Sequence, residues 1–147
     1  MQTTNGITQE VTINEATTTE ATTTEATTTE ATLDQYLAMW NEPDDAARAE
    51  QVYAIVTDDA RLVDPLLDAT GPDGIAVAIG ALRNQMPGHS LTRTTSVDAH
   101  HDQARFGWTV NAPDGSVAVA GIDVVTFAPD GRIQSAVGFF GELTPVA

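Results

Sequence analysis

The chain of 147 residues contains no cysteine and no lysine. Without cysteine it has no disulfides, thiolate nucleophiles, thiolate zinc sites or iron–sulfur clusters. Without lysine it has neither Schiff-base chemistry nor the lysine of a phosphate-binding loop. No apolar run is long enough to predict a transmembrane helix, and the first ten residues lack the pattern of a signal peptide. We therefore expect a cytoplasmic protein without a membrane partner.

Basic residues are scarce: six arginines stand against 21 acidic residues, giving a net charge of −15. A chain this acidic repels polyanions at long range, and six scattered arginines do not form a basic patch. We therefore expect no nucleic-acid partner. The length is that of a single domain with one hydrophobic core.

The N-terminal segment has a composition of its own. Within residues 1–32, a unit of alanine, three threonines and glutamate repeats with a period of five, which fits neither a helix nor a strand. The segment has almost no large apolar side chain to bury. We predict a disordered acidic tail over 1–32, serving as a tether or a solubilising brush, and a globular domain over 33–147.

The sequence pattern of the domain predicts helices followed by strands. Apolar spacing predicts three helices, the first over 33–40. The second begins at Asp44 or Asp45 and ends near Thr57. The third is capped by Asp73 and ends at Pro87-Gly88. Alternation predicts strands at 61–65, 90–99, 103–112, 116–127 and 132–140, with Asp-Gly turns before the last two. This order predicts an α+β fold, in which the helices pack on one face of a curved antiparallel sheet.

Two aspartates interrupt apolar strand sequence. Asp64 precedes Pro65, and Asp123 stands in Gly-Ile-Asp-Val-Val. Aspartate is depleted in strands and is rarely buried without a partner. A carboxyl group on the concave face would lose solvent and have a raised pKa. The alternative interpretation is structural: each aspartate either faces solvent or is a hydrogen-bonded acid without a role in catalysis.

Other side chains leave two interpretations open. Phe106, Trp108, Val110, Phe127, Phe139 and Phe140 either line an apolar pocket or fill the core. His100 and His101 lie beside Asp98 and Asp102, which is compatible with a metal site, but a solvated turn is the preferred interpretation.

Residues 58–65 (DDARLVDP) resemble the ketosteroid isomerase segment that carries an aspartate base directly before proline. Residues 121–127 (GIDVVTF) with 130–134 (DGRIQ) are similar to the strand and hairpin around that enzyme's protonated aspartate. Tyr36 falls where the family's oxyanion-hole tyrosine is expected. Over roughly 33–142 the chain therefore resembles the nuclear-transport-factor-2-like superfamily, in its SnoaL-like polyketide cyclase and ketosteroid isomerase branch. The resemblance implies an α+β cone, in which three N-terminal helices pack on the concave side of the curved antiparallel sheet.

The resemblance implies catalysis by Asp64, Asp123 and Tyr36. Asp64 would be the general base that moves a proton next to a carbonyl, while Tyr36 and neutral Asp123 would donate hydrogen bonds to the enolate oxygen. No metal or organic cofactor is implied, and a homodimer is expected. The alternative is a non-catalytic ligand-binding or interaction module on the same fold.

The implied ligand is a small apolar carbonyl compound, steroid- or polyketide-like. The residues expected to bind it are apolar side chains of the helices and strands: Trp40, Leu66, Leu82, Met86, Phe106, Trp108, Val110, Phe127 and Phe140.

Overall fold

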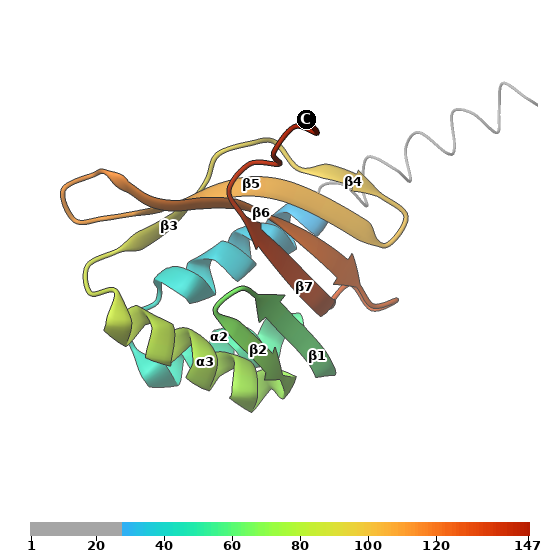
Figure 1. The fold of residues 1–147 in the computed structure, drawn as a ribbon. Coiled ribbons are helices and arrows are strands. Elements are labelled where there is room, and N and C mark those ends of the chain that lie inside the picture. The colour runs from blue at the N-terminus through green and yellow to red at the C-terminus, as the bar shows by residue number, and fades with distance from the viewer. Residues whose placement is uncertain (1–27) are drawn as a thin grey trace, which may run out of the picture.

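The computed structural model describes residues 28–147, in which helices pack against one face of a curved sheet (Figure 1). A first helix covers residues 28–41. The elements that follow are α2 (Asp45–Ile55), β1 (Val56–Asp64), β2 (Leu67–Thr70), α3 (Gly71–Gln85), β3 (Ser90–Arg93), β4 (Asp98–His100), β5 (Gln103–Asn111), β6 (Val117–Phe127) and β7 (Ile133–Phe140). The predicted α+β cone with three helices is confirmed.

The first helix presents an apolar stripe to the sheet. Leu33, Tyr36 and Met39 recur every three residues and are at most 1% exposed. Residues 28–32 are helical too, although the sequence had placed them in the tail. The Arg93 Nη1 atom of β3 lies 3.6 Å from Glu30 Oε1, and this ion pair connects the first turn of the helix to the sheet. The rest of the predicted tail, 1–27, lies outside the described residues.

The two following helices begin differently. Asp44 caps α2, as one of the two predicted alternatives, because its carboxylate accepts a 2.8 Å hydrogen bond from the Ala47 N–H. The predicted cap of α3 is wrong: Thr70 holds that position without a side-chain bond, and Asp73 lies inside the first turn. The Asp73 carboxylate instead accepts a hydrogen bond from the Tyr53 hydroxyl.

The sheet has the strand order β2-β1-β7-β6-β5-β3, with β4 also paired to β5. It is mixed rather than wholly antiparallel, since β1 and β7 run parallel. The sequence pattern did not predict β2, which turns back on β1 after Pro65 and pairs with it in the antiparallel direction. The single strand predicted over 90–99 is in fact two strands, β3 and β4, which are separated by residues 94–97.

Both predicted Asp-Gly turns are present between the long strands. Asp114 and Asp130 each accept a hydrogen bond from the backbone N–H two residues on, at 2.9 and 3.0 Å. The glycines that follow them, Gly115 and Gly131, have φ of 87° and 88°, which is strained for any residue with a side chain. These turns set the register of β5 with β6 and of β6 with β7.

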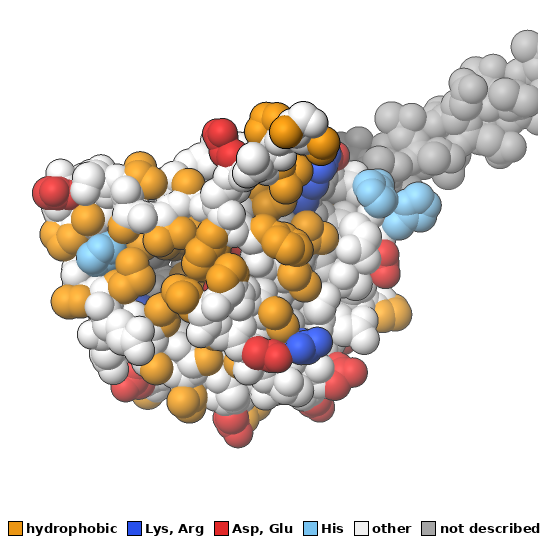
Figure 2. Space-filling model, viewed as in Figure 1, with side chains coloured by type: hydrophobic (Ala, Val, Ile, Leu, Met, Phe, Trp, Pro, Cys, Tyr) orange, Lys and Arg blue, Asp and Glu red, His pale blue; other side chains and the backbone are white. Residues whose placement is uncertain are grey.

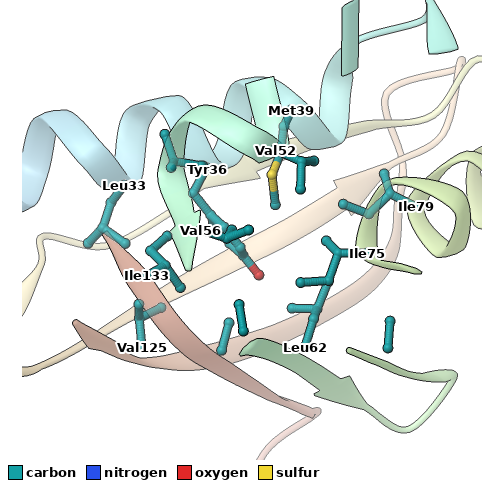
Figure 3. Close-up of a cluster of buried hydrophobic side chains, with 14 of the residues drawn as sticks. Leu33, Tyr36, Met39, Val52, Val56, Leu62, Ile75, Ile79, Val125 and Ile133 are labelled. Carbon is teal, nitrogen blue, oxygen red and sulfur yellow. The ribbon is translucent and has the colours of Figure 1, made fainter. Parts of the chain in front are cut away.

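The core lies between the helices and the concave face of the sheet (Figure 3). Side chains from all three helices meet β1, β6 and β7 there, and the Tyr36 hydroxyl points from its helix toward the strands. On the other face of the sheet, Ile122 and Phe139 are neighbours in register and are 43% and 58% exposed. Within residues 28–147, no helix is both long and apolar enough to cross a membrane.

We predict that Ile79→Ala lowers the free energy of unfolding by about 2–5 kcal/mol, because it leaves a cavity where a fully buried side chain packed. Val77→Ala on the same helix is the matched control, since Val77 is 73% exposed and should change stability by less than about 0.5 kcal/mol. Equilibrium urea unfolding measures both values. Equal losses would contradict the described packing of α3.

Candidate functional site

Strand pairing brings the two predicted aspartates to either side of one glycine. Asp123 of β6 pairs with Gly138 of β7, and Val63 of β1 pairs with Val137, so Asp64 lies beside Gly138 on the other side. A Cβ atom on Gly138 would lie 2.8 Å from Asp123 Oδ1 and 3.1 Å from the Asp64 Cβ. Gly138 therefore lets both acidic side chains approach the same place.

Asp123 is buried and fully engaged by two side chains. The Tyr36 hydroxyl donates to Oδ2 at 2.7 Å, and the Trp108 indole N–H donates to Oδ1 at 2.8 Å. Tyr36 comes from the first helix and Trp108 from β5, next to β6. The two bonds hold the carboxyl group in one orientation.

The protonation of Asp123 is set by competing effects. Burial disfavours the charged form and raises the pKa of Asp123, while the hydrogen bonds from Tyr36 and Trp108 lower it. Burial is the larger effect, and the negative charge of Asp64 acts in the same direction, so the pKa lies above its ordinary value. Asp123 therefore favours the neutral acid more than an exposed aspartate does.

Tyr36 is held in its protonated form. Burial raises the pKa of Tyr36 well above its ordinary value, and the neighbouring charge of Asp123 raises it further. Tyr36 can therefore serve as a hydrogen-bond donor and not as a base at neutral pH. Its ring also contacts Trp40 and Phe106 edge to face, with centroids 6.4 and 6.3 Å away.

Asp64 is more accessible than Asp123 and has different partners. Its Oδ1 accepts hydrogen bonds from the backbone N–H groups of Leu66 and Leu67, at 2.7 and 3.0 Å. These bonds close the turn between β1 and β2 around Pro65 and fix the carboxylate. Its Oδ2 has no hydrogen-bond partner among the described residues, which leaves that oxygen available to a ligand.

One cavity joins these groups. Asp64, Asp123 and Tyr36 all line it, between the sheet, the first helix and the end of α3. Hydrophobic side chains gather over this region of the surface (Figure 2). Seven of the predicted ligand-binding residues line the cavity: Trp40, Leu66, Leu82, Met86, Trp108, Val110 and Phe140.

A family model described as the SnoaL-like domain matches residues 33–136. The chain belongs to the SnoaL-like family. The resemblance seen at residues 58–65 and 121–127 is thereby confirmed at the level of the family. No curated protein matches the chain.

Solved structures agree with this membership. A structure from Agrobacterium tumefaciens, described as "a putative isomerase of the SnoaL-like family", is 36% identical, with a TM-score of 0.76, and the match covers 79% of this chain and 99% of that one. A "putative SnoaL-like polyketide cyclase" from Jannaschia is 15% identical, with a TM-score of 0.59 and coverage of 74% and 84%. A protein from Methylobium petroleophilum with a "cystatin-like fold" is 20% identical, with a TM-score of 0.65 and coverage of 81% and 79%. The last two show the fold alone.

Two predicted ligand-binding residues of this SnoaL-like domain do not line the cavity. Phe106 lies opposite Asp123 in register, but the Tyr36 ring covers it and it is 2% exposed. Phe127 is four residues beyond Asp123, about 13 Å along the strand, and packs against another part of the core. Phe139, the further aromatic candidate, faces outward with Ile122.

The cavity also contains residues that sequence reasoning missed. Asn41 exchanges two hydrogen bonds with the backbone of Leu91, at 2.7 and 2.8 Å, which closes the cavity beside β3. Arg83 and Gly138 contribute as well. An isolated glycine inside a strand pattern is a signal for close approach, so Gly138 was detectable from sequence. Arg83 had no such signal, because α3 carries it to the cavity only through tertiary packing.

The two adjacent histidines lie apart from this site. His100 ends β4 and His101 begins the turn before β5; both are exposed, with their Nδ1 atoms 3.2 Å apart. Within residues 28–147, no group of three or more potential side-chain ligands is arranged to hold a metal ion.

We predict that Asp123 titrates above, and the exposed Asp68 below, the ordinary pKa of aspartate. Arg61 hydrogen-bonds Asp68 and lowers the pKa of that carboxyl, whereas burial raises the pKa of Asp123. The stability contributed by Asp123 is therefore fully present below the pKa of an unfolded aspartate and is lost as the pH rises through the raised folded value. Side-chain carboxyl NMR resonances measure both residues in one titration. An Asp123 midpoint at or below that of Asp68 would contradict the described burial.

Proposed function

We propose that this chain is a cofactor-independent isomerase or cyclase that moves a proton on the carbon next to a carbonyl of an apolar, steroid- or polyketide-like substrate. The observation that carries the proposal is the single cavity in which Asp64, Asp123 and Tyr36 meet. Two acids in different environments can take opposite protonation states, as general acid–base chemistry requires. The Agrobacterium protein, which is 36% identical, is described as a putative isomerase, and this supports the proposal.

Asp64 is the general base in this proposal. Its backbone bonds orient the carboxylate, and its free Oδ2 can accept a proton from the carbon next to the substrate carbonyl. Positioned proton transfer of this kind contributes about 10²- to 10⁴-fold to a rate. The same oxygen can return the proton to another carbon of the substrate, which completes an isomerisation.

Tyr36 and Asp123 stabilise the negative charge that develops on the substrate oxygen. When Asp123 holds a proton, its carboxyl group can donate to the Tyr36 oxygen across the same 2.7 Å contact. The Tyr36 hydroxyl hydrogen can then turn into the cavity and bond the enolate oxygen. A fixed donor in a water-poor site contributes several kcal/mol to such a transition state.

A non-catalytic ligand-binding module is the competing function. A solvated Asp123, or one paired with an arginine, would favour that alternative. Instead Asp123 is 8% exposed, and no described arginine lies within salt-bridge distance of it. The arrangement therefore favours catalysis. The homodimer expected from the family resemblance stays a prediction.

We predict that the protein accelerates deuterium exchange at the carbon next to the carbonyl of an enolisable apolar ketone, with 2-tetralone in D₂O as the probe. Asp64→Asn should slow this exchange by about 10²- to 10⁴-fold, because it removes the base. Tyr36→Phe should slow it by about 10- to 10³-fold, because it removes a donor to the enolate. Proton NMR follows the loss of signal directly.

Asp68→Asn is the matched control. It changes the same chemical group on the neighbouring strand, outside the cavity, and removes only an exposed pair with Arg61. This variant should exchange at the wild-type rate. If 2-tetralone binds the wild-type protein but its exchange is not accelerated, the ligand-binding module is the better function.

A further inference from the structure

Arg83 lines the cavity and differs from the other five arginines of the chain in its ion pairing. Arg83 has no carboxylate within salt-bridge distance among the described residues. Each of the others has one: Arg48 with Asp45, Arg61 with Asp68, Arg93 with Glu30 and Asp34, Arg105 with Asp98, and Arg132 with Asp130. In a chain with 21 acidic residues, an arginine without an acidic partner is notable.

Arg83 has one structural bond and spare donors. One guanidinium nitrogen, Nη1, donates to the Trp40 carbonyl oxygen at 2.8 Å, near the C-terminus of the first helix, where a cation is favoured. A guanidinium group has five N–H donors, and no other acceptor for Arg83 is present among the described residues. The half-buried side chain lines the cavity with these donors unused.

A second donor in the cavity wall, the indole N–H of Trp40, lies next to Arg83. The Trp40 indole N–H is buried and makes no hydrogen bond of good geometry with the described residues, although it acts on the Tyr36 hydroxyl and lowers the pKa of that group. Trp40 lines the same cavity and contacts the Tyr36 ring. Buried donors are nearly always hydrogen-bonded in folded proteins, so this N–H, which makes no hydrogen bond of good geometry, can accommodate an acceptor on a ligand.

We propose that the substrate carries a carboxylate in addition to its enolisable carbonyl group, and that Arg83 anchors this carboxylate. This inference rests on the proposed function. The planar fork of an arginine matches the two oxygens of a carboxylate. The ionised Asp64 would repel an anion, so the carboxylate lies on the α3 side of the cavity and the reacting carbonyl on the Asp64 side.

The walls between these two ends define the rest of the ligand. Trp40, Leu82, Met86 and Phe140 form an apolar lining. A cyclic body can pack there, with the Trp40 indole N–H donating to an oxygen substituent. The substrate class is therefore an aromatic or alicyclic keto acid. A neutral ketone has no carboxylate for Arg83 to bind.

The first test uses binding without chemistry, so that it does not depend on turnover. We expect 2-naphthoate to bind the wild-type protein about 10- to 100-fold more tightly than 2-naphthamide, which has the same ring but no charge. Arg83→Gln should abolish this preference, and Arg83→Lys should keep part of it. Arg105→Gln, which removes an exposed arginine outside the cavity, should keep all of it. Titration calorimetry gives the dissociation constants, and thermal melts verify folding of each variant.

The second test asks whether the anchor serves the reaction. Exchange of 4-oxocyclohexanecarboxylate should exceed that of its methyl ester in the wild-type protein and in the Arg105→Gln control, and Arg83→Gln should remove the difference. A wild-type protein that binds naphthoate no tighter than naphthamide overturns the carboxylate inference, even if 2-tetralone exchanges. Selective naphthoate binding without exchange of any ketone supports the anion site and overturns the proposed catalysis instead.

Discussion

The buried carboxyl group of Asp123 is the feature on which the described structure depends. Removing an acid from water is unfavourable unless hydrogen bonds replace its solvation. Those bonds come from Tyr36 on the first helix and from Trp108 on β5, residues far apart in the chain. The contact therefore fixes the helix over the sheet and the register of two strands at once. The cavity forms where this arrangement leaves the concave face uncovered.

The same constraint divides the two acids. Asp123 lies under the helix and loses its solvent, while Asp64 lies at a turn where backbone N–H groups hold one of its oxygens. Gly138 separates them by a single strand. A side chain at this position would displace one acid from the other, so the glycine preserves their electrostatic coupling. Asp123 thus favours the neutral acid more than an exposed aspartate does, whereas Asp64 keeps one carboxylate oxygen free of hydrogen-bond partners among the described residues.

Local chemistry explains what the sequence could predict. Asp64 and Asp123 were visible because each breaks an apolar strand, and the Asp-Gly turns because they need a particular backbone conformation. The parallel pairing of β1 with β7 was not visible, since it joins segments about 75 residues apart. Phe127 was misplaced because strand alternation predicts which face a residue is on but not its position along the cavity. Arg83 was missed because its lack of an acidic partner is a property of the folded chain alone.

Charge links the surface to the cavity. The net charge of −15 creates a field that opposes the approach of an anion, whereas Arg83 attracts it at contact. The two effects differ in range: at physiological ionic strength the surface field is screened beyond about 8 Å, while a half-buried contact is screened much less. Added salt therefore weakens the repulsion more than the contact. An anionic ligand of this cavity should bind no more weakly at moderate salt than at low salt, which is opposite to the behaviour of an anion held by an exposed basic patch.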